Sequence, residues 1–156
     1  MESKMLEEPK VTKEEVIQVV AFQLGTEEYA INILSVQEIN RLLNITRVPR
    51  ANKNIDGVVN LRGNIIPVIN LHKKFNIVSS GDDEDKRIIV FQVDDVKTGI
   101  IVDRVSEVLH VKTENIENTG NVLISIDAEM ISGVAKVDDR LLILLDLQKL
   151  MGLQGI

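Results

Sequence analysis

The 156-residue sequence contains no cysteine and no tryptophan, and aromatic residues make up only 3% of it. Without cysteine, the chain can form no disulfide bond, no thiolate nucleophile and no cysteine-based zinc site. Few aromatic side chains are present on which the bases of a nucleic acid could stack. The two histidines, His72 and His110, have no partner at a spacing typical of metal ligands. We therefore expect neither a metal nor another cofactor.

Long apolar runs and an excess of positive charge are also missing. No apolar run approaches the roughly 20 residues that a membrane-spanning helix requires, and residues 1–15 carry charges of both signs, unlike a signal peptide. The net charge of -6 disfavours a nucleic-acid partner, because phosphate binding requires a basic surface. The sequence therefore predicts a cytoplasmic protein that neither inserts into a membrane nor binds nucleic acid.

The common sequence motifs of catalysis are absent as well. The chain has no Gly-x-Gly-x-x-Gly or Walker A loop for nucleotides and no Gly-x-Ser-x-Gly nucleophile motif. The acidic pairs 82–83 and 138–139 fall in a linker and in a predicted hairpin turn, where solvated loop charge is the simpler explanation. We predict no catalytic residue.

What the sequence does contain is a series of short apolar strings typical of β-strands. "VIQVVAFQLG" and "EEYAINI" predict a hairpin around residues 25–27, and "RIIVFQV" with "KTGIIVDRV" predicts a second one. Ser35 and Glu38 fit a capping box, which indicates a helical turn in "SVQEINRLL". "LQKLMG" predicts a short C-terminal helix that stops at Gly152.

An internal repeat organises these strings. Residues 22–24, Phe-Gln-Leu, return as residues 91–93, Phe-Gln-Val, and the ungapped extension pairs Val36 with Val105 and Glu38 with Glu107. "IDGVVNLRGNIIPVINL" from Ile55 aligns with "ISGVAKVDDRLLILLDL" from residue 131. Duplication predicts two similar small β-barrels or sandwiches on either side of the acidic linker 79–86. The expected boundaries are a flexible tail at 1–15, one lobe at 16–78, a second at 87–150, and a C-terminal tail at 151–156.

The hairpin "GVVNLRGNIIPVINL" carries one arginine, Arg62, in its most apolar surroundings. We expect Gly63 or Asn64 to adopt positive φ in the turn, and Pro67 to lie in an edge strand or at a bulge. The repeat places Asp138 opposite Arg62, which suggests that this arginine serves the first half alone. It could form a bidentate pair with Glu38. The alternatives are an exposed turn residue for Arg62 and the capping box for Glu38.

The surplus of aliphatic residues favours docking over catalysis. Two small lobes share only one interface, so apolar edge strands must pack between the lobes or be covered by a partner.

At "GVVNLRG" (57–63) and "PVINL" (67–71) the chain resembles the CheW family of bacterial chemotaxis. "FQLGTEEYAINILSVQEI" and "GIIVDRVSEVL" extend the resemblance, which covers 16–150. It implies two five-stranded, SH3-like β-barrel lobes around a shared interface, with short helices that include a C-terminal one. It further implies a non-enzymatic adaptor that couples the cytoplasmic tips of transmembrane chemoreceptors to the regulatory domain of a CheA-type histidine kinase in signalling arrays.

The resemblance also assigns residues to two surfaces. The receptor-binding groove is expected between the lobes, with a salt bridge at Glu38 and Arg62, and kinase contacts are expected at the barrel ends. The receptor set is Val36, Glu38, Gly57, Val58, Asn60, Arg62, Gly63, Gly99 and Ile101; the kinase set is Ile33, Arg47, Val48 and Pro49.

Two other classes of protein stay open on the residues alone. A small enzyme could build its site from dispersed carboxylates, and an enclosed pocket with two perturbed carboxylates would favour it. A nucleic-acid-binding barrel could use the chain's concentrated positive charge, which comprises Arg41, Arg47, Arg50 and Lys53.

Overall fold

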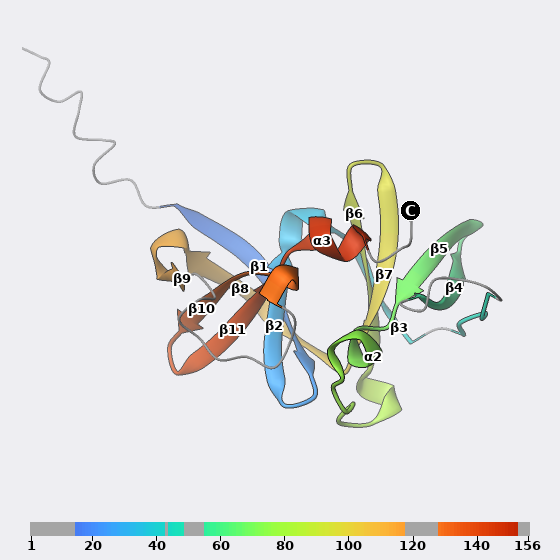
Figure 1. Cartoon of the computed structure of the whole chain (residues 1–156), viewed down its shortest axis with the longest axis horizontal. Helices are drawn as coiled ribbons and strands as arrows, with labels where there is room; N and C mark the ends of the chain where they lie inside the picture. The colour runs from blue at the N-terminus through green and yellow to red at the C-terminus, as the bar shows by residue number, and fades with distance from the viewer. Residues whose placement is uncertain (1–14, 43, 49–54, 118–127, 153–156) are drawn as a thin grey trace, which may run out of the picture.

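The computed structural model describes residues 15–42, 44–48, 55–117 and 128–152. Strands dominate, as the sequence predicts, and the helices are short (Figure 1). In chain order the elements are β1 (Val16–Leu24), β2 (Glu27–Asn32), η1 (Ile33–Ser35), β3 (Val36–Arg41), β4 (Ile55–Leu61), β5 (Asn64–Ile69), α2 (Leu71–Phe75), η2 (Asp83–Asp85), β6 (Arg87–Val93), β7 (Val96–Val102), β8 (Arg104–Lys112), η3 (Thr113–Asn115), β9 (Ile116–Glu117), η5 (Ala128–Met130), β10 (Ile131–Val137), β11 (Arg140–Leu145) and α3 (Leu147–Met151).

The strands form two sheets that stand side by side in Figure 1. Sheet A has the order β8-β1-β2-β11-β10-β9, and sheet B has the order β3-β6-β7-β5-β4. Each sheet therefore takes strands from both halves of the chain. The predicted boundaries, 16–78 and 87–150, describe the two repeats and not the two sheets, because each repeat gives its first hairpin to one sheet and its remaining strands to the other.

The strand order of the two sheets reflects the internal repeat. By the sequence alignment, β6 and β7 repeat β1 and β2, β8 repeats β3, and β10 and β11 repeat β4 and β5. With these equivalents, the two sheets have the same strand order apart from the additional β9. The helices obey the same relation: the Asn70 side chain accepts a hydrogen bond from the Lys73 amide at the start of α2, and Asp146 does so from Lys149 at the start of α3.

Equivalent turns also share their backbone conformation. Arg62, with φ 51°, and Asp138, with φ 57°, both adopt positive φ at the same place in their hairpins. The expectation for this turn is confirmed, because Gly63 adopts positive φ (88°), and Arg62 before it does so as well. Two successive positive-φ residues characterise the tight hairpin turn whose twist matches that of the strands.

Two local predictions are wrong. Glu38 lies in strand β3, and the turn before it, η1, ends at Ser35; its cap is Asn32, whose side chain accepts from the Leu34 amide at 2.9 Å. Pro67 does not lie in an edge strand, because β5 pairs with both β4 and β7. It is tolerated there because the pairing with β7 involves only Val68 and Ile69.

Three apolar clusters hold the molecule together. The largest lies between the sheets, where Phe22, Tyr29 and Phe91 are fully buried and where α2 and α3 contribute side chains. A second, around Leu142, lies on the other face of sheet A, and a third, around Val68, lies on the other face of sheet B. Because both faces of the central strands are buried, these strands read in the sequence as continuous apolar runs.

Candidate functional site

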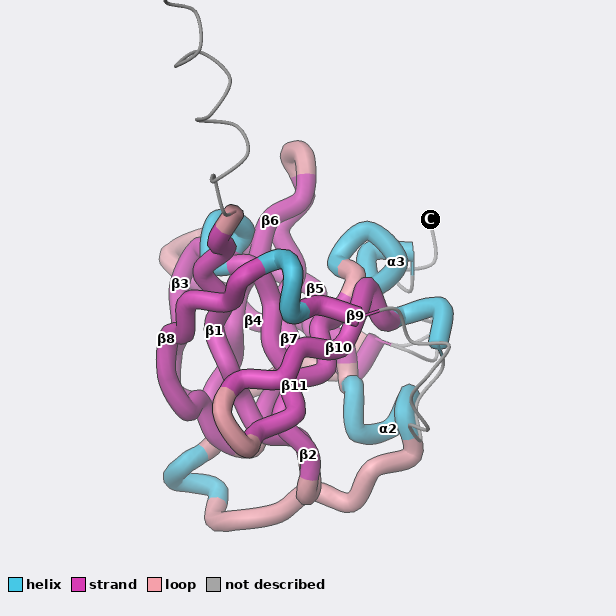
Figure 2. The backbone as a smooth tube through the Cα atoms, turned by 90° about the vertical axis from the view of Figure 1, so that its left-hand side faces the viewer, coloured by secondary structure: helices cyan, strands magenta, loops and turns pink. Residues whose placement is uncertain are grey.

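The two edge strands β3 and β8 are equivalent in the repeat and lie on the same side of the molecule. Figure 2 shows them opposite α2 and α3, which cover the other side. The helices bury Leu71, Phe75 and Leu150 against the inter-sheet core. Among the described residues, no helix covers the β3 and β8 side in this way. The core is therefore shielded asymmetrically.

Apolar side chains remain exposed along these two strands. Ile39 of β3 pairs with Ile89, and Val108 of β8 pairs with Val20; both partners belong to the inter-sheet core. Paired residues point to the same face of a sheet, so Ile39 and Val108 extend that core toward solvent. They are nevertheless 39% and 46% exposed. The same alignment that pairs Val36 with Val105 pairs Ile39 with Val108.

Val36 and Val105 complete this surface. Both are half-buried and pack against the inter-sheet core, as does Ile33 in the neighbouring turn η1. We name the surface made by Val36, Ile39, Val105 and Val108 the β3–β8 face. The sequence prediction included Val36 and missed the other three, although the internal repeat could have identified them.

Glu38 and Arg62 form the predicted ion pair. Arg62 Nη2 donates to Glu38 Oε2 at 2.5 Å, and Asn40 Nδ2 donates to Glu38 Oε1 at 3.0 Å. Because β3 and β4 are opposite edges of sheet B, the pair joins the two edges of a rolled sheet. The side chain of Arg62 is 69% exposed and reaches Glu38 through a single nitrogen, so the bidentate geometry is not found. Hydrogen bonds from Asn40 and then Arg62 lower the pKa of Glu38.

A backbone bridge lies beside this ion pair. The Thr46 amide donates to the Val58 carbonyl at 2.9 Å, and the Val58 amide donates back to the Thr46 carbonyl at 2.8 Å. The chain that follows β3 thus pairs with β4 and draws the two edges together. Asn60 Oδ1 accepts from the Gly63 amide at 2.9 Å and braces the turn that carries Arg62.

The second half has its own version of the pair. Glu107, the equivalent of Glu38, accepts from Arg140 Nη1 at 2.7 Å, and Arg140 also makes a bidentate contact with Glu28 at 2.9 and 2.8 Å. The hydrogen bond from Arg140 is the main cause that lowers the pKa of Glu28. Arg62 itself pairs within the first half, but an arginine–glutamate pair is not particular to that half. The second half supplies its arginine from β11, two positions beyond Asp138.

These two pairs should differ in stability. Arg140→Ala leaves Glu28, whose side chain is only 20% exposed, without its charged partner, and we expect the free energy of unfolding to fall by about 2 kcal/mol. Arg62→Ala removes one exposed contact and should cost no more than about 1 kcal/mol. Urea denaturation of the two variants measures the difference. A loss for Arg62→Ala that equals or exceeds the loss for Arg140→Ala would contradict this ranking.

Two of the predicted receptor residues are buried glycines. A Cβ at Gly57 would lie 2.4 Å from the Thr46 carbonyl oxygen, and one at Gly99 would lie 3.2 Å from Ile88 Cγ2. Gly57 therefore makes room for the Thr46 bridge, and Gly99 for close packing in the centre of sheet B. Neither glycine is accessible to a partner. Their role is to position neighbouring residues that are accessible.

The remaining predicted residues are dispersed. Val58 is half-buried in β4, and Ile101 is half-buried beside a hollow of about 420 Å³ that it shares with His72 and Lys86. Arg47 and Val48 are exposed just beyond the Thr46 bridge, whereas Ile33 packs next to Val36. Pro49 lies outside the described residues, as do Arg50 and Lys53.

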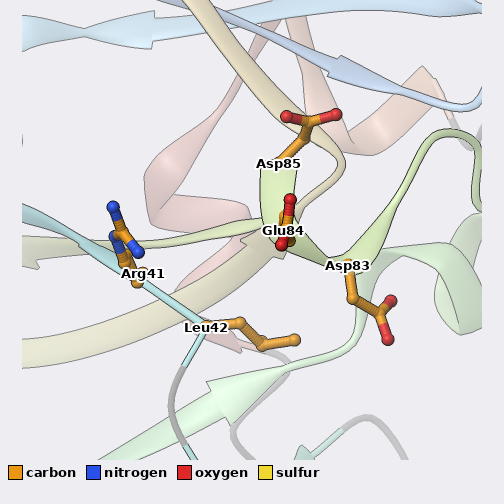
Figure 3. A pocket seen from close by; sticks show the side chains of 5 residues that line it. All are labelled: Arg41, Leu42, Asp83, Glu84 and Asp85. Carbon is orange, nitrogen blue, oxygen red and sulfur yellow. The ribbon is translucent and has the colours of Figure 1, made fainter.

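Part of the expected basic patch faces acidic residues. Arg41, at the end of β3, lines a hollow of about 360 Å³ together with Leu42 and the three acidic residues of η2 (Figure 3). Asp83, Glu84 and Asp85 are all exposed. Arg41 therefore shares its surroundings with three acidic residues, and these exposed carboxylates are not the enclosed, perturbed pair named above for the enzyme alternative. In the described part of the chain, no group of histidine and carboxylate side chains could hold a metal ion.

No helix in the described ranges is long and apolar enough to cross a membrane.

Together, these features define a class of protein: a duplicated β domain whose halves exchange strands and whose equivalent edge strands leave apolar side chains uncovered. Comparison with known proteins names the family. A model of the CheW-like domain matches residues 18–154. The chain is 39% identical to the chemotaxis protein CheW of Treponema pallidum (strain Nichols) over 146 residues, which cover 91% of this chain and 86% of that protein. This chain belongs to the CheW family.

Other relatives agree. The chemotaxis protein CheW of Thermotoga maritima is 37% identical over 134 residues, covering 86% of this chain and 87% of that one. The crystal structure of the scaffolding protein TtCheW from Thermoanaerobacter tengcongensis superposes with a TM-score of 0.79 at 38% identity, covering 87% of this chain and 88% of that chain. The predicted family and fold class are confirmed.

Proposed function

We propose that this protein is a chemotaxis adaptor that couples chemoreceptors to a CheA-type histidine kinase and has no catalytic activity of its own. Its place is the cytoplasm, at membrane-associated receptor arrays. Membership of the CheW family supports the general role. The uncovered β3–β8 face is the observation that carries the receptor-binding part, because exposed aliphatic side chains continuous with a core are what an amphipathic helix covers.

The receptor tip binds along the β3–β8 face. Val36, Ile39, Val105 and Val108 contact its apolar residues, and Ile33 belongs here by its packing rather than with the kinase set. Glu38 and Arg62 act at the margin of this face by holding the rolled edge of sheet B in place. Gly57 and Gly99 act indirectly, through the packing that positions β3 and β4.

The kinase binds elsewhere, at the end of the lobe where Arg47 and Val48 are exposed. Two separate surfaces allow one adaptor to hold both partners at once. A substitution on one surface should therefore weaken one interaction and spare the other.

Titration calorimetry tests this assignment with a receptor-tip fragment and with the kinase regulatory domain. We expect Ile39→Asp and Val108→Asp each to weaken receptor binding at least tenfold, which corresponds to about 1.4 kcal/mol, because a charge placed in an apolar contact must be desolvated. Kinase binding should change less than twofold. Both residues are substantially exposed, so the fold should tolerate the change.

Val78→Asp is the matched control. Val78 is also an aliphatic residue, is 86% exposed, and lies in the segment after α2, on neither β3 nor β8. It should leave both interactions within twofold of the unmodified protein. Equal effects of all three substitutions on receptor binding would remove the β3–β8 face from the proposal, and wild-type protein that binds neither partner would remove the adaptor function.

A further inference from the structure

A buried carboxylate with several donors lies at the junction of β7 and β8. The side chain of Asp103 is 2% exposed. Its donors come from the β1–β2 turn, from α2 and from the segment that connects the two repeats. They are Gly25 N at 2.7 Å and Ser80 N at 3.0 Å to Oδ2, and Ser79 Oγ at 2.6 Å and His72 Nε2 at 2.9 Å to Oδ1. The Lys86 ammonium group, 3.8 Å from Oδ1, adds an ion pair without a hydrogen bond.

The connecting segment lies tightly against the β1–β2 turn. Gly25 has φ 64°, and a Cβ there would be 2.6 Å from Ile77 Cγ2 and 3.1 Å from the Val78 carbonyl oxygen. Ser80 Oγ also donates to the Gly25 carbonyl at 2.9 Å. The turn belongs to sheet A, whereas Ile77 follows a helix that extends from sheet B, so the contact ties the two sheets together.

The equivalent place in the other repeat has no such carboxylate. The alignment that pairs Val36 with Val105 places Leu34 opposite Asp103 and Asp94 opposite Gly25. Leu34 is 87% exposed. One of the two repeats therefore folds without such a cluster. The cluster lies where the chain passes from the first repeat to the second.

We propose that Asp103 is a conformational latch: it holds the connection 77–86 closed against the β1–β2 turn, and when it is disengaged the connection detaches while both sheets stay folded. This device does not depend on the proposed adaptor function. His72, Ser79 and Lys86 of the latch also line the hollow of about 420 Å³ beside Ile101. Opening the latch therefore reshapes a surface on which another molecule could act.

The ionised carboxylate is the form that the latch requires. Burial by itself raises the pKa of Asp103, but hydrogen bonds from Ser79, Gly25 and Ser80 outweigh burial and lower the pKa below its usual value. An asparagine has the same shape but only one acceptor oxygen, and its amide group would face donors. Asp103→Asn therefore removes the charge that strengthens these hydrogen bonds and one of the two acceptor oxygens, and should weaken the closed state.

Limited proteolysis and amide exchange measure the release. Trypsin cuts after Lys86, the last residue of the connection, whose side chain is only 15% exposed in the closed form. In Asp103→Asn we expect cleavage there, and exchange of the Gly25 and Ser80 amides, to accelerate at least tenfold. Exchange at Phe91, in the centre of sheet B, should change less than twofold because the sheets stay folded.

Asp82→Asn is the matched control, because it makes the same chemical change in the same segment at an exposed residue whose side chain does not cap η2. It should change cleavage less than twofold. If Asp103→Asn does not fold, Ser79→Ala tests the same point by removing the 2.6 Å bond to Asp103 and the 2.9 Å bond that Ser79 Oγ accepts from Lys86 Nζ, with an expected acceleration of about threefold. Unchanged exchange at Gly25 and Ser80 in the variant that folds, or equal acceleration at Phe91, would overturn the latch.

Discussion

Gly57→Val should lower the free energy of unfolding by about 3 kcal/mol, the upper end of the range for overpacking a filled site. A Cβ at this position would lie 2.4 Å from the Thr46 carbonyl oxygen and 2.6 Å from Ile45 Cγ2. The first neighbour is backbone and cannot rotate away. The bridge between Thr46 and Val58 must then separate, and the rolled edge of sheet B must open beside the Glu38–Arg62 pair.

Thermal and urea unfolding measure this effect, and the melting temperature should fall by roughly 6–12 °C for a chain of this size. Gly152→Ala is the control. Gly152 has φ -62°, and a Cβ there meets nothing within 4 Å, so alanine should be neutral or slightly stabilising. A Gly57→Val protein as stable as the unmodified one would show that the 45–46 segment does not pack against β4 in solution.

This result would also explain how a glycine can belong to a receptor-binding surface. Gly57 is buried, so its substitution should weaken receptor binding only to the extent that β3 and β4 are displaced. The loss of binding should therefore follow the loss of stability across Gly57→Ala and Gly57→Val. In contrast, Ile39→Asp should reduce binding with little change in stability.

The Glu38–Arg62 ion pair is the part of the site that can be predicted from the sequence. Glu38 and Arg62 were identified because each lies beside an apolar segment, and a pair of opposite charges in such surroundings is expected to meet. The second pair is not apparent in the alignment, because its arginine does not lie at the position equivalent to Arg62. Arg140 lies two residues beyond Asp138, at the start of β11. Its long side chain nevertheless reaches Glu107, the residue equivalent to Glu38.

The exchange of strands between the repeats could not be predicted in the same way. Alternation of apolar residues shows which faces of a strand are buried, but it does not say which strand lies alongside. β1 could pair with β3 of its own repeat or with the equivalent β8, and the two edges present similar residues. In the structure β1 pairs with β8, and the pairing contains a β-bulge between Ala21 and Phe22. The equivalent pairing of β3 with β6 contains a β-bulge as well.

Asp103 was not predicted because its sequence context carries no signal. It follows a buried strand and precedes an exposed arginine, which is ordinary for a strand end. Its donors are distant in the chain, from Gly25 to Lys86. Similarly, Ser35 and Glu38 fit a capping box, but pairing of β3 with β6 outweighs that local preference.

Strand exchange leads to the last expected result: neither half of this chain should fold alone as a monomer. A fragment 1–81 keeps β1 and β2 but lacks their partners β8 and β11, and it keeps β3, β4 and β5 without β6 and β7. An isolated two-stranded hairpin is marginal in water, and the inter-sheet core would be exposed. Circular dichroism should show no cooperative thermal transition for either 1–81 or 82–156.

Mixed in equal amounts, the two fragments should assemble into one cooperative heterodimer whose melting temperature rises with concentration. The control is the full-length chain with a protease site inserted after Gly81 and cut only after folding, which should stay associated. Autonomous lobes would give the opposite result, because fragment 1–81 would then melt cooperatively as a monomer. The experiment thus distinguishes two repeats that exchange strands from two lobes that fold independently. Only strand exchange makes each repeat depend on the other for the strands that bury its apolar faces.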